Sequence, residues 1–215
     1  MARHALASED KQARREVILE AARRLFVTGD GSLPSAAQIA AASGLAKGTV
    51  YLYFRTKEEI FAALLLAGWG TLMNDVAAAI ASIRGRRGDK VTAFLTTYVG
   101  HLERHPELLR LDALGPGVLE RNLDAATLRD FKLTLVSRLT EVGAVVEEAL
   151  RLSDRRGLSL LMRTYALTRG LWQSSQGYED PALLETVPAL AYLHPDFGTE
   201  LREALTEYWR GALTN

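Results

Sequence analysis

The 215-residue chain contains no cysteine. This absence excludes disulfide bonds and thiolate metal sites, and it fits a reducing compartment such as the cytoplasm. Residues 1–17 lack the apolar core of a signal peptide. The longest apolar run, residues 60–73, is also shorter than the ~20 residues that a membrane-spanning helix requires. We therefore expect a soluble, cytoplasmic protein with no membrane partner.

The chain also lacks an excess of charge of either sign. It carries 26 Lys and Arg against 26 Asp and Glu, and residues 1–60 carry nine against seven. A basic excess this small cannot by itself indicate a nucleic-acid-binding domain, because such domains usually carry a much larger one. Any prediction of DNA binding must therefore rest on a motif.

The sequence also lacks the patterns that are typical of β-strands. No segment alternates apolar and polar residues for long, and Gly and Pro fall mainly between segments of helical period, as at Gly115-Pro116-Gly117, Asp180-Pro181 and His194-Pro195. The sequence therefore predicts an all-α fold. The expected helices are 10–28, two short helices within 35–54, 57–83, 88–104, 106–113, 124–152, 155–177, 181–193 and 198–213.

Residues 35–60 have the spacing of a helix-turn-helix. Two steeply crossing helices need a small residue where their backbones approach and a residue that tolerates positive φ at the turn; Ala40 and Gly44 supply these. Helical spacing then separates an apolar inward set from a polar outward set. The inward set is Ile39, Leu45, Val50 and Phe54, and the outward set is Gln38, Lys47, Thr49, Tyr51 and Tyr53.

Two flanking segments complete this motif. An apolar stripe on helix 10–28 would cover it from behind, formed by Val17, Ile18, Ala21, Ala22, Leu25 and Phe26. After it, Thr56 and Glu59 have the spacing of a capping box that begins the next helix. Lys57 then lies beside unpaired backbone N–H groups, where the helix dipole disfavours a cation unless an anion binds nearby.

The stretch AKGTVYLYFRTKEEI at residues 46–60 resembles the signature of the tetracycline repressor (TetR) family of bacterial transcriptional regulators. The resemblance covers residues 13–72. It implies a three-helix helix-turn-helix DNA-binding domain at 13–72 and a larger helical ligand-binding and dimerisation domain at 73–215. One departure is Ala46, which stands where the family commonly has a Ser or Thr that caps the recognition helix.

The same resemblance implies that residues 46–52 enter the major groove of double-stranded DNA. Lys47 and Thr49 would lie near base edges or adjacent phosphates, while Tyr51, Tyr53 and Lys57 would bind the phosphate backbone. Ser35 matches a phosphate-contacting position of the family, although it could equally be only an N-cap. The predicted DNA-binding residues are Ser35, Gln38, Lys47, Gly48, Thr49, Tyr51, Tyr53 and Lys57.

Two C-terminal helices carry more apolar surface than one neighbour would cover. Helix 155–177 has one apolar face with Leu158, Leu161, Met162, Tyr165 and Trp172 and a second with Leu160, Leu167 and Leu171. Since a helix with two apolar faces needs two partners, a homodimer interface is expected. Its predicted residues are Leu160, Leu167, Leu171, Leu201, Leu205, Tyr208 and Trp209. The alternative is a helix buried inside one subunit.

The first of those faces could line a pocket for a small, mostly apolar effector, together with helix 88–104. The predicted lining residues are Phe94, Tyr98, His101, Met162, Tyr165 and Trp172. The alternative is that they are ordinary core residues, as aromatic side chains at helical spacing usually are.

No pattern in the sequence indicates a metal, a cofactor or catalysis. His101 and His105 stand four apart, but Pro106 ends their helix at once and no carboxylate of matching spacing accompanies them. No Lys-Ser/Thr follows the glycine turn at 115–117, so it does not resemble a phosphate loop. No nucleophile and base are arranged for catalysis. We expect no cofactor, no metal site and no enzymatic activity.

Together these features predict a DNA-binding transcriptional regulator. The expected protein is a repressor that binds a near-palindromic operator as a homodimer and is released by a small, largely apolar ligand. An activator on the same fold is the nearest alternative. The remaining one is a helical ligand-binding protein or enzyme in which residues 35–60 are only a helical corner.

Overall fold

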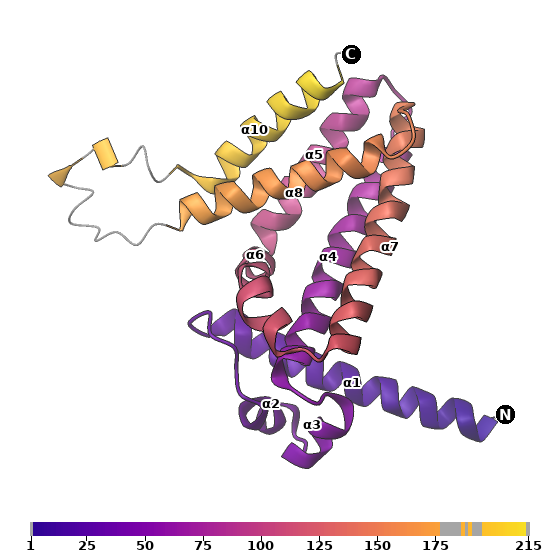
Figure 1. Cartoon of the computed structure of the whole chain (residues 1–215), viewed down its shortest axis with the longest axis vertical. Helices are drawn as coiled ribbons and strands as arrows, with labels where there is room; N and C mark the ends of the chain where they lie inside the picture. Colours follow the sequence, from indigo (N-terminus) through magenta and orange to yellow (C-terminus); the bar gives the residue numbers. More distant parts are fainter. Residues whose placement is uncertain (1, 177–185, 188, 191–194, 214–215) are drawn as a thin grey trace. The chain divides into compact units, whose positions relative to one another are not determined.

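The computed structural model describes residues 2–176, 186, 187, 189, 190 and 195–213, and side chains from residue 10 onward within them. The described residues form helices and turns without a strand, which confirms the all-α class (Figure 1). The α-helices are α1 (Ala2–Thr28), α2 (Ala36–Ser43), α3 (Lys47–Tyr53), α4 (Lys57–Ser82), α5 (Arg87–Arg104), α6 (Pro106–Ala113), α7 (Ala125–Leu150), α8 (Arg156–Ser175) and α10 (Phe197–Ala212).

Two predicted boundaries differ from the structure. Helix α1 begins at Ala2 rather than near residue 10. The Gly115–Gly117 segment, expected as a break, instead lies in a π-helical turn, Gly115–Leu119, in which the Leu119 N–H donates to the Leu114 carbonyl. A 3-10 turn, Glu120–Asn122, follows. Most of the predicted helix 181–193, with the breaks at Asp180-Pro181 and His194-Pro195, lies outside the described residues.

The chain forms two compact units. Unit 1 comprises Met1–Trp69 and Arg110–Leu135, and unit 2 comprises Gly70–Leu109 and Val136–Asn215. Helix α4 therefore contributes its first half to unit 1 and its second half to unit 2. The division into domains at 13–72 and 73–215 stays a prediction, because the units are not contiguous in sequence.

The core of unit 1 packs α1 against α2 and the start of α4. Ile18, Ala21 and Phe26 are buried on α1, and the Phe26 ring centroid lies 5.7 Å from that of Phe61 on α4. The predicted stripe was wrong at Val17, whose side chain is 47% exposed. The inward face of α1 is therefore rotated slightly from the predicted stripe, and it includes the buried Leu19 instead.

The turn between α2 and α3 has the predicted geometry. Gly44 adopts φ 69°, and its N–H and that of Leu45 donate to the Ala41 and Ala40 carbonyls at the end of α2. Most residues pay an energetic penalty for this left-handed conformation, whereas glycine does not. Ile39, Val50 and Phe54 are buried as predicted, and Leu45 is half-buried.

Helix α4 is long and apolar enough to cross a membrane by length and composition alone. Half of its most apolar window is buried inside the protein, however. Ile60, Phe61 and Leu65 belong to the core of unit 1, while Leu72 and Ile80 belong to that of unit 2. Core packing therefore accounts for the apolar character of this helix.

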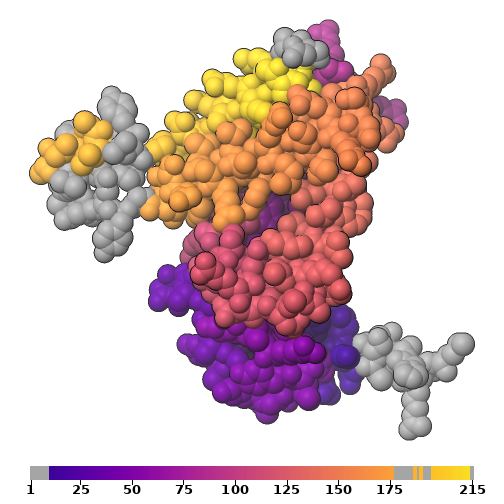
Figure 2. Space-filling view, viewed as in Figure 1, coloured from indigo at the N-terminus to yellow at the C-terminus, as the bar shows by residue number. Residues whose placement is uncertain are grey.

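The core of unit 2 is built from aromatic rings and threonines on α5, α8 and α10. The Phe94 ring lies 4.8 Å from the Trp209 ring and 6.0 Å from the Tyr98 ring. The Tyr98 and Thr168 hydroxyls are 3.0 Å apart, and Trp209 Nε1 donates to Thr164 Oγ1 at 3.0 Å. Figure 2 shows the surfaces of α8 (orange) and α10 (yellow) in contact.

Candidate nucleic-acid interface

The start of α2 is fixed by a reciprocal capping box. Ser35 Oγ accepts the Gln38 N–H at 3.3 Å, and Gln38 Oε1 accepts the Ser35 N–H at 2.8 Å. The two side chains also bond each other, since Ser35 Oγ donates to Gln38 Oε1 at 2.8 Å. The alternative that Ser35 is an N-cap therefore holds in this structure, and both side chains remain exposed at the surface.

Helix α3 begins without a side-chain cap. Ala46 stands at the N-cap position, and only its carbonyl accepts hydrogen bonds, from the Thr49 and Val50 N–H groups. A Ser or Thr cap would stabilise such a helix by about 1 kcal/mol. This helix therefore depends on the burial of Val50 and Phe54 for its position.

The exposed part of α3 is organised in three rows of residues four apart, which face away from the buried Val50. One flank carries Lys47 and Tyr51, the centre carries Gly48 and Leu52, and the other flank carries Thr49 and Tyr53. Tyr51 is 46% exposed and Leu52 80%, whereas Thr49 and Tyr53 are half-buried. Lys47 Nζ lies 5.9 Å from the centroid of the Tyr51 ring.

The start of α4 has a capping arrangement that differs from the predicted one. Thr56 Oγ1 accepts the Glu59 N–H at 3.2 Å, as expected, but the Glu59 carboxylate accepts the N–H of Arg55 rather than that of Thr56. The bend before α4 is thereby tied to its first turn. This contact leaves Lys57 at the beginning of the helix, partly exposed.

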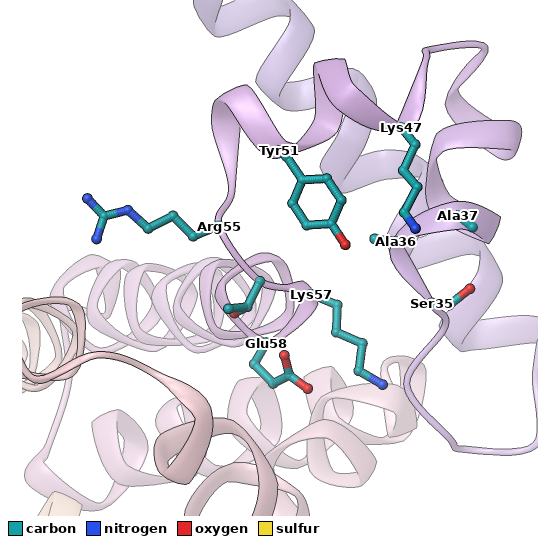
Figure 3. A pocket seen from close by; sticks show the side chains of 9 residues that line it. Ser35, Ala36, Ala37, Lys47, Tyr51, Arg55, Lys57 and Glu58 are labelled. Atoms are coloured by element: carbon teal, nitrogen blue, oxygen red, sulfur yellow. The ribbon is translucent and has the colours of Figure 1, made fainter.

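These three helix starts enclose an open cleft of about 360 Å³ in unit 1. Figure 3 shows Lys47 and Tyr51 reaching down from α3 toward the space where Lys57 extends from α4 and Ser35 and Ala37 lie at the start of α2. The complete lining is Ser35, Ala36, Ala37, Lys47, Tyr51, Arg55, Thr56, Lys57 and Glu58. The unpaired N–H groups at the start of α2 add partial positive charge to this cleft.

The charge of the cleft is positive. Lys47, Arg55 and Lys57 face one carboxylate, Glu58, among its lining residues. Arg55 points away from Lys57 in Figure 3, and its NH1 lies 3.3 Å from an Asp124 carboxylate oxygen. Because Arg55 is 79% exposed, this ion pair is a weak constraint on it. The cleft thus offers cations, a phenol hydroxyl and backbone N–H groups, which are the donors that bind phosphate.

The cleft brings together four of the eight residues predicted to bind DNA, namely Ser35, Lys47, Tyr51 and Lys57. Gly48 is exposed on the central row of α3, and Gln38 is exposed on α2. The sequence analysis did not single out two further residues of this region. Arg55 belongs to the quoted signature and lines the cleft, and Leu52 is the most exposed large apolar residue among those described. An angular plot of α3 would have placed Leu52 opposite Val50.

The residues predicted to line an effector pocket are not all on one surface. Phe94, Tyr98 and His101 are buried on α5. On α8, Tyr165 and Trp172 are half-buried, and Met162 is 45% exposed. Met162 was therefore misplaced, because the inward face of α8 is formed by Gly157, Leu160, Leu161, Thr164 and Thr168. Trp172 instead packs edge-on against Phe197, with ring centroids 5.1 Å apart.

His101 has a defined polar environment in unit 2. Its Nδ1 lies 3.1 Å from an Asp75 carboxylate oxygen, and its ring centroid lies 4.7 Å from that of His105. Burial lowers the pKa of His101 below its usual 6.5, against the opposing effect of the Asp75 hydrogen bond, so the imidazole is neutral at pH 7. The described residues contain no group of three or more side chains suited to hold a metal ion.

The predicted dimer-interface residues fall into two groups. Leu160, Leu201, Leu205 and Trp209 have no exposed surface within the single chain, so their side chains cannot form a face that meets a second copy. Their assignment to the dimer interface is therefore corrected. The alternative, that these four side chains are buried inside one subunit, is supported. Leu167, Leu171 and Tyr208 are half-buried and keep accessible surface. Within the described part of the chain, the Tyr208 hydroxyl is buried without a hydrogen-bond partner.

Comparison with protein families accounts for almost the whole chain. Residues 18–64 match the model described as bacterial regulatory proteins, tetR family, and residues 66–215 match the tetracyclin repressor-like C-terminal domain. The first match contains α2, α3 and the cleft, and the second contains α5 to α10. No curated protein sequence matches the chain.

Several solved structures share the fold. A bacterial regulatory protein in the tetR family from Rhodococcus RHA1 is 17% identical, with a TM-score of 0.54 over 93% of this chain and 95% of that one. The transcriptional regulator FadR from Bacillus subtilis, in complex with stearoyl-CoA, is 16% identical, with a TM-score of 0.52 over 89% and 97%. The TetR family regulator PfmR from Thermus thermophilus is 17% identical, with a TM-score of 0.51 over 91% and 96%.

Proposed function

Because the chain belongs to the tetR family of bacterial regulatory proteins, and so is a DNA-binding transcriptional regulator, we propose that it is a repressor. It binds a near-palindromic operator as a homodimer and leaves it when a small, largely apolar ligand binds. It works in the cytoplasm through binding alone, without catalysis. The single observation that carries the DNA-binding part of this proposal is the positively charged cleft beside the exposed face of α3.

The cleft holds the phosphate backbone next to the major groove. Lys47, Tyr51 and Lys57 supply two cations and a phenol hydroxyl directed to one space. A bound phosphate would offset the unfavourable position of the Lys57 ammonium at the positive end of the α4 dipole. Contacts of this kind set the register of a protein on DNA without reading its sequence. Thr49, on the opposite flank of α3, contacts base edges, and Tyr53 binds phosphate on that side.

Dimerisation places two copies of α3 in successive major grooves. Two-fold symmetry then predicts half-sites about one helical turn, ~34 Å, apart. The accessible residues of the predicted interface, Leu167, Leu171 and Tyr208, are the ones that pair the two copies.

The effector binds in unit 2, where apolar rings surround a few polar groups. The buried hydroxyl pair of Tyr98 and Thr168, and the imidazole of His101, can orient a polar group on an otherwise apolar molecule. FadR from Bacillus subtilis, which shares the fold, was solved with stearoyl-CoA, a molecule that carries a long apolar acyl chain. The ligand releases DNA only by its difference in affinity between the DNA-bound and free conformations.

The test is binding to double-stranded DNA that flanks the protein's own coding region, measured by fluorescence anisotropy with an unlabelled competitor. We expect saturable binding whose affinity falls steeply as the salt concentration rises. Unrelated DNA, added at the same concentration as the specific unlabelled competitor, is expected not to displace the labelled fragment. Thr49→Ala is expected to change which fragment is preferred, since Thr49 contacts bases. An absence of salt-sensitive, saturable binding to every fragment would support a helical ligand-binding protein instead.

A reporter gene placed after the bound fragment separates the two regulatory roles. Deleting the regulator is expected to raise transcription from that fragment. A fall in transcription would identify an activator and contradict the repressor proposal, while leaving DNA binding intact.

A further inference from the structure

Leu52 is an exposed leucine in the centre of the outward face of α3. Its side chain is 80% exposed, more than any other large apolar residue described. Successive residues of a helix are separated by about 100°, so Leu52 projects almost directly away from Val50, which is buried. Folding of the single chain therefore gives no reason for a leucine at this position.

The residues around Leu52 leave room for a large partner to approach closely. Gly48 lies one turn before it on the same row, and a Cβ atom built on Gly48 would meet nothing within 4 Å. The flanking rows carry Lys47 with Tyr51 and Thr49 with Tyr53. One cation and three hydroxyls therefore border an apolar centre that has open space beside it.

A major groove has the complementary arrangement. Phosphates line both of its edges, and the 5-methyl group of thymine is the apolar group on its floor. When Lys47, Tyr51 and Lys57 bind phosphate, the central row of α3 faces the base pairs. Resting on the DNA-binding function proposed above, we propose that Leu52 packs against a thymine methyl group in each half-site and thereby specifies thymine there.

The chemistry of this contact sets its expected size. Removing one buried methyl group costs about a four-fold loss of affinity, and two half-sites double the effect on the free energy. Cytosine and uracil lack the methyl group, so the contact distinguishes thymine from both. Hydrogen bonds from other residues are unaffected by the exchange of thymine for uracil, because uracil keeps the O4 acceptor.

The experiment begins with a binding site selected from random duplexes by the full-length protein. Each thymine of the selected site is then replaced by deoxyuridine, one symmetric pair at a time, and affinity is measured by fluorescence anisotropy at fixed salt. For the unmodified protein, we expect one symmetric pair at which uracil weakens binding about sixteen-fold, or four-fold for each methyl. Leu52→Ala is expected to bind the thymine and uracil sites equally.

Two further variants keep this test decisive. Leu52→Met retains an apolar side chain of similar length and is expected to retain the preference for thymine. Leu133→Ala removes another exposed leucine, 59% accessible on α7, and is expected to behave like the unmodified protein. Circular dichroism melting of each variant checks that it is folded.

The outcomes separate this inference from the proposed function. If a site is selected but no thymine methyl matters, or if Leu52→Ala keeps the full preference, only the role of Leu52 is overturned. If no sequence is enriched and no saturable binding occurs, both proposals fail.

Discussion

The helix-turn-helix of unit 1 and the helical core of unit 2 use the same residue types in opposite ways. In unit 1, Tyr51 and Lys57 keep accessible surface and face a cleft. In unit 2, Tyr98 and Trp209 are buried, and their polar atoms bond threonines of a neighbouring helix. An aromatic residue with a polar tip therefore serves as an external donor in one unit and as an internal tie in the other.

The largest expected effect is the loss of stability when a buried aromatic residue of unit 2 is removed. Trp209→Ala removes a fully buried ring and its hydrogen bond to Thr164, so we expect a loss of about 3–5 kcal/mol in the free energy of unfolding. Urea denaturation at two protein concentrations measures this loss and separates it from dimer dissociation. Trp209→Phe, which keeps most of the volume, is expected to lose less.

One result would instead support the original assignment of Trp209 to the dimer interface. A Trp209→Ala variant that unfolds at the same urea concentration as the unmodified protein, but is monomeric by sedimentation, would place Trp209 at the interface and not in the core.

Substitution of Tyr51 tests whether an exposed aromatic residue of unit 1 binds DNA. Because its side chain is 46% exposed, Tyr51→Ala is expected to change stability by less than about 0.5 kcal/mol. Affinity for DNA is expected to fall about tenfold on every sequence alike, since a phosphate contact carries no sequence information. Anisotropy titrations on the selected site and on random DNA measure both affinities.

Tyr51→Phe separates the hydroxyl of this residue from its ring. We expect it to lose nearly as much affinity as Tyr51→Ala. A Phe variant with full affinity would show that the hydroxyl does not bind phosphate.

The two units also differ at one kind of turn. Gly44 after α2 has φ 69°, and Arg151 after α7 has φ 53° in a similar arrangement, in which the Leu152 N–H donates to the Glu147 carbonyl. A side chain is strained in this conformation, so Arg151→Gly is expected to raise the free energy of unfolding by about 0.5–1 kcal/mol. Gly44→Ala is expected to lower it by a similar amount, and Arg129→Gly within α7 is the control that should destabilise.

Urea denaturation of the three variants checks this comparison of turns. An Arg151→Gly variant that is less stable than the unmodified protein would contradict it.

The smallest effect concerns the pH dependence of unit 2. Burial lowers the pKa of His101 below 6.5. At pH values between this lowered pKa and 6.5, His101 is therefore protonated in the unfolded chain but neutral in the folded chain. The stability contributed by the neutral imidazole is therefore complete above about pH 6.5 and is lost as the pH falls toward the lowered pKa. His101→Gln is expected to show a flatter decline between about pH 7 and 5 in urea denaturation.

The charged and titratable groups in contact with His101 act in the same experiment. Asp75 on α4 raises the pKa of His101, while His105, just after α5, and Arg104, at its end, lower it. An equally steep decline in the His101→Gln variant would assign the pH dependence to other groups.

Local spacing predicted unit 1 well because its determinants lie within a few residues of one another. The glycine turn at Gly44, the N-cap at Ser35, and the burial of Val50 and Phe54 each follow from neighbours in the sequence. Even there, the Glu59 carboxylate bonded Arg55 rather than Thr56, since two adjacent N–H groups compete for it.

Unit 2 could not be predicted in the same detail, because which side of each helix is buried depends on helices that are distant in the sequence. Leu160 and Leu161 were assigned to two different faces of one helix, but both are buried, with Thr164 and Thr168 completing the same inward face. A sequence shows that α8 has apolar residues on several sides. It does not show that Leu160 lies on the buried face of α8 while Met162 stays exposed.

The central claim is that the cleft of unit 1 binds DNA phosphate. The most direct measurement is the salt dependence of affinity for one DNA duplex, compared among the unmodified protein, Lys57→Ala and Arg87→Ala. Arg87 is an exposed cation at the start of α5 in unit 2, outside the cleft. We predict that Lys57→Ala reduces the slope of log affinity against log salt by about one for each subunit, and that Arg87→Ala leaves it unchanged. A slope unaltered by Lys57→Ala would contradict the account.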